Sequence, residues 1–424
     1  MTKNDTAWQE IENELNIIRH VNNNNEFIIT TNQIKSIGER EPRLMAKFDH
    51  KDKLPKLFSK NELGILPVSR SEYFISKFRL FCDVNVNNDK DIDEIIVDKN
   101  SISKYKTINI NEINSEDKAL LIAKIFNVFQ NFTGENDLRI TNKGRFGTDI
   151  LNFSLETLSG NLKEIVVRGS MADLDLGIEG NNFYTVEAKM GKINDFNIRQ
   201  LYYPFLYWSN RIDKPVIPIF FVYHDKSFHL YQYHFLDKTN FHSIKLIKHS
   251  KFSVSKKVIL NESILDIDEF LLSDLEGVPF PQADDFEKVI DVIDLIYSNY
   301  NNKEDFTEYF DFTPRQTDYY FNAARYLGLV ERHNRNFYLT ELGLDTVRFE
   351  RTTRHAKLIK LILLHKVFYD VFMIIFRDNT ITNDEIIEIM ENNNVSVSEN
   401  TLSRRAQTIK SWCLWIKEKF EENA

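Results

Sequence analysis

Runs of apolar residues that alternate with polar ones, or that continue without interruption, predict β-strands in the first part of the chain. These runs lie at 150–155, 164–168, 216–223 and 228–235. A helix is predicted from Ser115, a good N-cap residue, to Gly134, because apolar residues recur there at helical spacing. The order of helix, strands, helix and strands predicts a mixed sheet with a helix on each face, an α/β (α+β) fold.

The pattern becomes mainly helical after a stretch at 275–283 that is punctuated by Pro and Gly. Three helices are predicted, at 286–297, 304–310 and 313–327, the last with Thr313 as N-cap and Pro314 as its first residue. Gly328 ends the third helix, and a small hairpin is predicted at 329–340. Three helices followed by a hairpin are typical of the winged helix-turn-helix.

The rest of this second half predicts more helices. A long helix is expected at 348–376, with a basic start and an apolar second half that is buried in the domain or in a dimer interface. A helix, an Asn-rich turn and a further helix capped by Ser398 follow at 379–420 and resemble a second helix-turn-helix. We therefore expect a mainly α domain over 284–424.

The first 114 residues have a less regular pattern. It predicts an amphipathic helix at 8–20, a turn at 22–25 and a strand near 73–78. Between these elements the chain is broken by prolines and biased toward basic residues, namely Arg40, Arg43, Lys47, Lys51, Lys53 and Lys56. Two interpretations stay open: an arm that contacts the DNA backbone, or a solvated cap on the core. The predicted organisation is thus an N-terminal segment at 1–114, a core at 115–275 and a C-terminal domain at 284–424.

Composition narrows the class of protein. The chain has 424 residues, is 42% hydrophobic and carries a net charge of −9, so a generally sticky nucleic-acid coat protein is not expected. The two cysteines, Cys82 and Cys413, do not predict a disulfide framework or a zinc cluster. No signal peptide and no apolar run of about 18 residues stands out, so we expect a cytoplasmic protein without a membrane partner.

Candidate chemistry concentrates between Ser170 and Trp208. Asp175 is followed by the possible turn Gly180-Asn181-Asn182, whose residue types tolerate positive φ, and then by Glu187-Ala188-Lys189. If these three residues form the loop of a hairpin, Ile178 and Glu179 pair with Phe183 onward, and Asp175 lies opposite Glu187 on one face. The period of two places Lys189 on that same face.

Two carboxylates and a lysine are residue types that hydrolysis of a phosphodiester requires. Carboxylates hold Mg²⁺, which lowers the pKa of a bound water, and a lysine adds positive charge near the transition state. The following helix carries Arg199, Gln200, Tyr203 and Tyr207. Asp173 is an alternative to Asp175 as the first acid of the site. The alternative to a catalytic site as a whole is a solvated cross-strand charge pair with no catalytic role.

Candidate DNA contacts lie in both halves. In the core they are Arg145, within an expected turn at 144–147, and Arg199. At the start and outer face of the presumed recognition helix they are Arg315, Gln316 and Tyr319, and at the tip of the hairpin they are Arg332 and Arg335. Arg404 and Arg405 are candidates on the last helix. A winged helix that serves only protein contacts is the alternative.

The core residues resemble the PD-(D/E)XK nuclease signature: an acid, roughly a dozen residues, and Glu-x-Lys on the next strand. Leu174 stands where the family usually has a proline, which leaves the first acid open. Gln200 resembles a glutamine that supports the site in many of these nucleases. The chain is most similar to bacterial type II restriction endonucleases, through EPRLMAKFDH (41–50), ILPVSR (65–70), DLGIEG (175–180), VEAKMGK (186–192) and RQLYYP (199–204).

This resemblance implies Mg²⁺-dependent cleavage of double-stranded DNA at a short specific site. It also implies a homodimer, and a cognate DNA methyltransferase that protects the host. Within the resemblance, Asp175 and Glu187 are the expected metal ligands, and Lys189 and Gln200 complete the catalytic set. Two alternatives remain: another PD-(D/E)XK nuclease, such as a repair, resolvase or defence enzyme, or a non-catalytic winged-helix regulator with a decayed nuclease core.

Overall fold

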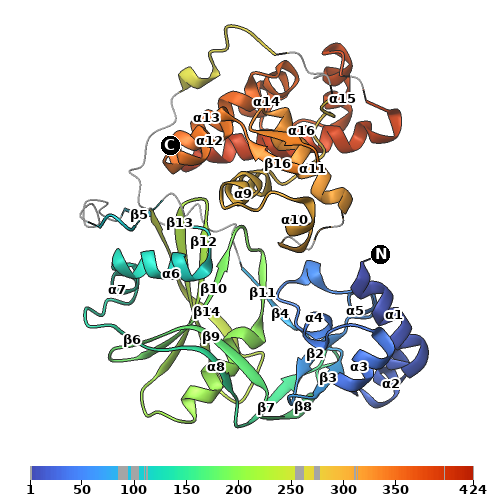
Figure 1. Cartoon of the computed structure of the whole chain (residues 1–424), viewed down its shortest axis with the longest axis vertical. Coiled ribbons are helices and arrows are strands. Elements are labelled where there is room, and N and C mark those ends of the chain that lie inside the picture. Colours follow the sequence, from blue (N-terminus) through green and yellow to red (C-terminus); the bar gives the residue numbers. More distant parts are fainter. Residues whose placement is uncertain are drawn as a thin grey trace. The chain divides into compact units, whose positions relative to one another are not determined.

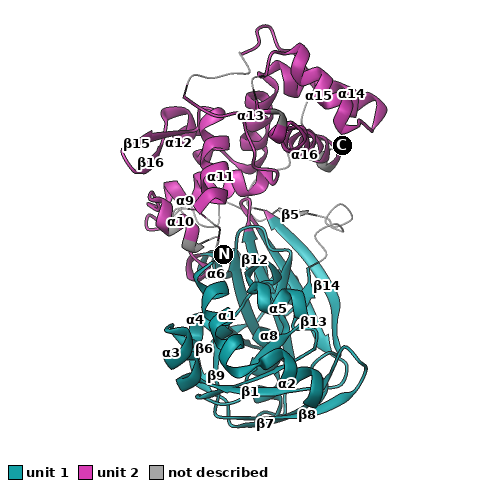
Figure 2. Cartoon of the chain, turned by 90° about the vertical axis from the view of Figure 1, so that its right-hand side faces the viewer, with its two compact units in different colours: residues 1–95, 119–223, 228–252 teal, residues 96–118, 224–227, 253–424 magenta. Residues whose placement is uncertain are grey.

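A computed structural model describes residues 2–84, 94–96, 105–108, 110, 113–253, 262–271, 277–309, 312, 314–395 and 397–423. The chain forms two compact units, coloured separately in Figure 2. Unit 1 contains residues 1–95, 119–223 and 228–252. Unit 2 contains residues 96–118, 224–227 and 253–424. The N-terminal segment thus groups with the following core, and not as a separate unit.

Unit 1 is built on a seven-stranded sheet of order β5-β14-β13-β12-β10-β9-β6 (Figure 1). These strands are β5 (Glu94–Ile96), β6 (Arg139–Gly147), β9 (Met171–Glu179), β10 (Phe183–Met190), β12 (Val216–His224), β13 (Ser227–Phe235) and β14 (Ile244–Ser253). β10 runs parallel to β12, whereas β9 is antiparallel to both β10 and β6. The sheet is therefore mixed, as predicted.

Successive residues of β12 contact different elements on opposite faces of the sheet. The ring of Phe221 lies 6.0 Å from Phe129 of α7 (Val128–Thr133), which follows α6 (Glu116–Ile125). The neighbouring Phe220 lies 4.5 Å from Phe196 of β11 (Asp195–Asn197), the strand that leads into α8 (Ile198–Ser209). In parallel register Glu187 pairs with Phe220, so Glu187 faces α8.

The N-terminal segment packs into the same hydrophobic core as the sheet, because buried residues from Ala7 to Phe81 join Phe183, Phe220 and Phe241 in one cluster. Figure 1 shows its helices on one side of the sheet and α6 and α7 on the other. Its elements are α1 (Lys3–Leu15), α2 (Ile17–Asn24), β1 (Phe27–Thr30), α3 (Thr31–Gly38), α4 (Pro42–Ala46), η1 (Lys51–Lys53), α5 (Lys56–Asn61), β2 (Gly64–Pro67), β3 (Glu72–Ser76) and β4 (Phe81–Asp83).

Several local predictions for unit 1 need correction. Residues 144–147 are not a turn but the end of β6; Gly144, at φ 102°, sits beside a register shift within that strand. The predicted helix at 8–20 is two helices, because Asn16 adopts the left-handed conformation between them. The predicted strands at 150–155 and 164–168 exist as β7 (Ile150–Glu156) and β8 (Leu162–Arg168), but they form a separate two-stranded sheet.

Unit 2 is mainly helical. It contains η4 (Glu262–Leu265), α9 (Phe286–Tyr297), α10 (Lys303–Tyr309), α11 (Pro314–Tyr326), the hairpin β15 (Val330–His333) and β16 (Asn336–Leu339), α12 (Glu341–Arg348), α13 (Arg351–Leu363), α14 (Lys366–Asp378), α15 (Asn383–Asn392) and α16 (Glu399–Asn423). The predicted order of three helices and a hairpin is confirmed, although Thr313 lies outside the described residues. Nowhere in the described ranges is a helix both long and apolar enough to cross a membrane.

The long helix predicted at 348–376 is wrong. α12 ends at Arg348, and the chain forms two helices there, α13 and α14, with breaks at Phe349-Glu350 and at Leu364-His365. Two arginines of the predicted basic start lie inside the fold, because Arg351 is 9% exposed and Arg354 is fully buried. Both arginines belong to an internal network of charges.

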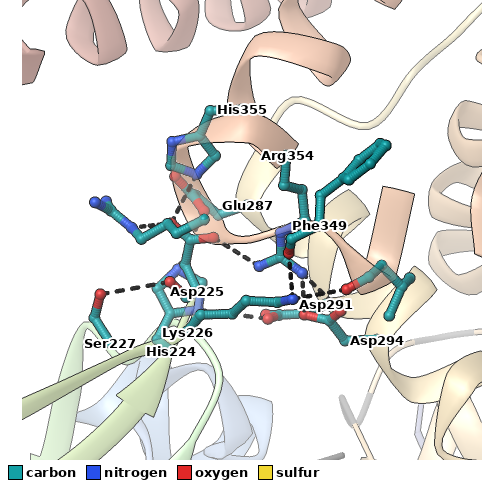
Figure 3. A network of polar contacts seen from close by, with 12 residues as sticks. His224, Asp225, Lys226, Ser227, Glu287, Asp291, Asp294, Phe349, Arg354 and His355 are labelled. Atoms are coloured by element: carbon teal, nitrogen blue, oxygen red, sulfur yellow. Dashed lines mark hydrogen bonds and ion pairs between the residues drawn. The ribbon is translucent and has the colours of Figure 1, made fainter. Parts of the chain in front are cut away.

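This network surrounds Asp225, at the turn after β12, which groups with unit 2 (Figure 3). The carboxylate of Asp225 accepts hydrogen bonds from Arg351 Nε at 2.6 Å and Arg354 Nη2 at 2.7 Å, and His355 Nε2 lies 2.7 Å away. Arg354 Nη1 also donates to Asp294 at 2.8 Å. Each buried charge therefore has an opposite charge in contact, which offsets the cost of removing it from water.

Burial alone would raise the pKa of Asp225, but His355, Arg351 and Arg354 outweigh it and hold this pKa well below its usual range. The neighbouring His224 shows the complementary effect. Burial would lower its pKa, but hydrogen bonds to Asp291 and Glu287 dominate and raise the pKa to about 10. Asp225 and His224 are thus charged at neutral pH, whereas burial outweighs the effect of Asp225 on His355 and lowers the pKa of that imidazole.

We expect Asp225→Asn to lower the free energy of unfolding by about 3–5 kcal/mol, since it leaves buried cations without their shared partner. Asp345→Asn, at an exposed position of α12, is the matched control. Because the folded-state pKa of Asp225 is depressed, its contribution is present above the ordinary value of 3.8 and is lost as pH falls below it. Urea unfolding at neutral and acidic pH measures this, and equal effects of both substitutions at neutral pH would contradict it.

Candidate active site

The turn between β9 and β10 forms where the sequence predicts it, but by different means. None of Gly180, Asn181 and Asn182 has a positive φ. The Glu135 carboxylate holds the turn instead, accepting from Asn181 N at 2.6 Å, Asn182 Nδ2 at 2.8 Å and the Tyr184 hydroxyl at 2.7 Å. Gly180 is required for this approach, because a Cβ there would lie 2.2 Å from Glu135 Oε2.

The predicted register of this hairpin is confirmed. Backbone pairs run from Phe183↔Glu179 to Val186↔Leu176, which puts Asp175 opposite Glu187 in the same register. The pairing ends at Val186, while β10 continues beside β12 to Met190. Beyond that point the Asp175 side chain replaces a backbone partner, because its Oδ2 accepts from Ala188 N at 2.8 Å. The two strands thus separate where the candidate carboxylates lie.

Glu187 is buried at this separation, 7% exposed, between the sheet and α8. Its Oε1 accepts hydrogen bonds from Lys189 Nζ at 2.8 Å and from Gln200 Nε2 at 2.6 Å. Burial raises the pKa of Glu187 to about 8, which Lys189 opposes and the charge of Asp175 reinforces. Asp175 and Glu187 therefore repel each other when both are ionised, and a cation between them would relieve that repulsion.

Two buried oxygen atoms beside Glu187 have no hydrogen-bond partner among the described residues. They are Oε1 of Gln200 and Oγ1 of Thr185, and both residues line a narrow crevice with Glu187. Hard divalent cations prefer oxygen ligands, and Mg²⁺ is commonly held by one or two carboxylates together with waters and substrate oxygens. Glu187 and these two oxygen atoms are thus ligands of the type that such a cation prefers, and Asp175, opposite Glu187 in the strand register, would supply a second carboxylate.

A larger metal cluster is not part of this site. Across the ranges that the structure describes, no group of three or more His, Cys, Asp or Glu side chains could hold a metal ion. The fit rests on two carboxylates only.

Asp173, the competing first acid, also lines the crevice but is engaged by cations. Arg145 Nε donates to its Oδ1 at 2.6 Å, and Lys47 Nζ lies 3.9 Å from its Oδ2. Burial would raise the pKa of Asp173, but these cations outweigh it and lower the pKa. Arg145, predicted as a DNA contact, thus binds a residue of the crevice, and Arg199, also predicted as one, precedes Gln200, which lines it.

Sequence reasoning missed a contribution of the segment that follows α4. Asp49 Oδ2 lies 3.8 Å from Lys189 Nζ, and His50 Nδ1 lies 2.6 Å from the backbone oxygen of Asp195. Asn197, the N-cap of α8, donates through Nδ2 to the backbone oxygen of Phe48 at 2.8 Å. The charged stretch 41–50 is visible in the sequence. Its contacts with residues far along the chain are not, because no local pattern predicts them.

The candidate DNA contacts of unit 2 differ in their surroundings. Arg315 and Gln316 are exposed on the first turn of α11, and Arg315 Nε donates to the hydroxyl of the half-buried Tyr319. Arg332 and Arg335 are exposed on the hairpin, and Arg404 is exposed on α16. Arg405 differs, because its guanidinium donates to the backbone oxygen of Phe280, a buried residue. This contact gives Arg405 a role in packing.

Three family models match consecutive parts of the chain, and each is described as a domain of unknown function. They cover residues 5–75 (DUF6996), 76–253 (DUF6997) and 288–421 (DUF7226). The candidate site lies within the second of these matches, and Lys47 and Asp49 lie within the first. No curated protein and no solved structure matches the chain.

The raised pKa of Glu187 predicts a pH-dependent affinity for divalent cations. Below a pKa of about 8 the carboxyl is protonated, so metal binding must expel one proton. Calorimetric titration of the full chain with Mn²⁺ should show affinity rising roughly tenfold per pH unit up to that value and levelling off above it. Glu187→Gln should abolish this dependence, and the exposed Glu164→Gln should preserve it. A wild-type affinity that does not change with pH would contradict the assignment.

Proposed function

We propose that this protein is a Mg²⁺-dependent endonuclease that hydrolyses phosphodiester bonds in double-stranded DNA. The observation that carries the proposal is the group of Asp175, Glu187, Lys189 and Gln200 at the separation of β9 and β10. Glu187 accepts hydrogen bonds from Lys189 at 2.8 Å and from Gln200 at 2.6 Å, and Asp175 accepts one from the backbone N of Ala188, next to Glu187, at 2.8 Å.

Each residue has a distinct task in this proposal. Asp175 and Glu187 hold the cation, which when bound supplies charge neutralisation and an acidified water. Gln200 fixes the orientation of Glu187 by donating to its Oε1. Lys189, 13% exposed in its side chain, keeps a positive charge at the place where negative charge develops on the phosphate oxygens.

Recognition of a specific sequence is assigned to unit 2. The order of its helices α9, α10 and α11 and its hairpin β15–β16 supports a winged helix, and the helices and mixed sheet of unit 1 support a restriction-endonuclease-like core. In a winged helix the third helix enters the major groove, and the hairpin contacts phosphates or the minor groove. The exposed Arg315, Gln316, Arg332 and Arg335 are suited to those contacts.

The resemblance of the site to type II restriction endonucleases extends the proposal to a homodimer that cuts at a short site. A cognate methyltransferase would then protect the host DNA. Incubation with unmethylated phage DNA and Mg²⁺ separates the alternatives. Discrete fragments support restriction, a smear indicates a nuclease without sequence specificity, and intact DNA favours a winged-helix regulator with an inactive core.

Substitution of the proposed catalytic residues should remove cleavage but not binding. We expect Asp175→Asn, Glu187→Gln and Lys189→Ala each to slow cleavage by about a hundredfold or more, because each removes a metal ligand or a charge at the reacting phosphate. The exposed Asp213→Asn and Lys245→Ala are the matched controls. Near-normal cleavage by Asp175→Asn would transfer the first ligand to Asp173, and near-normal cleavage by either other variant would overturn the site.

The hairpin and helix of unit 2 should contribute differently to DNA binding. Arg315→Ala or Gln316→Ala should relax specificity, with a loss of about 1–3 kcal/mol at one base pair. Arg335→Ala should weaken binding to every sequence and make it less dependent on salt, since one fewer counterion is released. Titrations of cognate and scrambled duplexes, with Arg377→Ala as the control, measure both effects. If affinity and salt slope stay constant in all three variants, unit 2 does not contact DNA.

A further inference from the structure

Cations from three separate segments gather on one side of the candidate crevice. Lys47 follows α4, Arg145 lies on β6, and Arg199 lies in the first turn of α8. All three belong to unit 1, and Asp173, which lines the crevice, is the carboxylate that Lys47 and Arg145 share. The group therefore carries more positive than negative charge.

Arg199 is the least compensated member of this group. It is only 7% exposed, and no carboxylate of the described residues lies within salt-bridge distance of it. Its guanidinium lies 6.0 Å from the ring centroid of Tyr203, which offers a weak interaction. A buried charge without a counterion is costly, so the position favours an anion from outside the chain.

The pKa of Lys47 is affected by the neighbouring positive charges. Burial and the charge of Arg199 lower the pKa of Lys47 to about 8, and Asp173 opposes this only in part. Arg43 and Arg145 act in the same direction as Arg199. An anion that binds between Lys47 and Arg199 would therefore be stabilised by several cations at once.

We propose that Lys47, Arg145 and Arg199 bind a phosphate group of the DNA strand beside the crevice, and that Asp173 is an internal counterion which this phosphate displaces. Asp173 holds Arg145 and Lys47 in place while no DNA is bound. The identification of the anion as a DNA phosphate rests on the proposed function. The anion site itself rests only on the charges around Asp173.

Lys47 and Asp173 should have opposite effects on DNA binding. In the presence of EDTA, so that no cleavage occurs, Lys47→Gln should weaken binding of a short fluorescent duplex to the full chain several-fold. It should also reduce the slope of log affinity against log salt by about 0.9, the value for one lost phosphate contact. Asp173→Asn should strengthen binding several-fold, since the competing carboxylate is removed. Lys60→Gln, at an exposed position of α5, should leave both quantities unchanged.

A purely structural role for these residues predicts a different result. Loss of packing would weaken binding in both variants, so weaker binding by Asp173→Asn, or an unchanged salt slope in Lys47→Gln, would overturn the proposal. Arg199→Gln should also weaken binding of the duplex. The comparison of Lys47→Gln with Asp173→Asn does not depend on whether the Arg199 variant folds. The other possible anion is free inorganic phosphate. Thermal unfolding in phosphate, compared with unfolding in chloride at equal ionic strength, tests whether the site binds it. Stabilisation by phosphate that Lys47→Gln abolishes, with duplex binding unaffected, would overturn the assignment to DNA.

The experiments can contradict the anion site without contradicting the nuclease proposal, and the reverse. If the binding effects appear but the wild-type chain leaves DNA intact with Mg²⁺, the catalytic proposal fails and the anion site stands. If the chain cleaves DNA but the variants bind like wild type, the anion site fails and the catalytic proposal stands.

Discussion

The Glu187 carboxylate is buried where β9 and β10 stop pairing, and its burial constrains the elements around it. An ionised carboxylate in this position requires nearby positive charge or hydrogen-bond donors, and Lys189 and Gln200 supply both. Gln200 can do so only because α8 lies against β9 and β10, with Asn197 capping its first turn. The position of α8, the separation of β9 from β10 and the position of Lys189 therefore depend on one another.

The N-terminal segment takes part in this arrangement. Residues 47–50 contact Asp173, Lys189 and Asp195, so the site draws on residues that are more than a hundred positions apart in the sequence. The shared hydrophobic core explains why the segment holds these contacts, since Phe48 is 3% exposed and sits between Lys47 and Asp49. The segment thus packs as part of unit 1 and brings Lys47 to Asp173, and its contact with DNA stays a prediction.

Local periodicity predicted the strand register at the candidate site correctly, although it merged separate helices at 8–20 and 348–376. The register of Asp175 and Glu187 followed from the alternation and from the position of one turn, and the hydrogen bond from Gln200 confirms that the helix after β11 faces Glu187. The role of Glu135 in that turn could not be predicted, because it depends on a residue more than forty positions away. The inward position of Arg351 and Arg354 could not be predicted either, because it depends on a distant carboxylate, Asp225. Gly144 had the composition of a turn, whereas pairing with β9 keeps it within a strand.

The central proposal is that Asp175 and Glu187 together hold a divalent cation where β9 and β10 separate. Its most direct test is a crystal of the full chain grown with Mn²⁺ above pH 8 and measured at the manganese absorption edge. The account predicts an anomalous peak within coordination distance, about 2.0–2.3 Å, of carboxylate oxygens from both residues. A peak elsewhere in the chain, or a site that keeps the Lys189–Glu187 pair with no peak beside it, would contradict the claim.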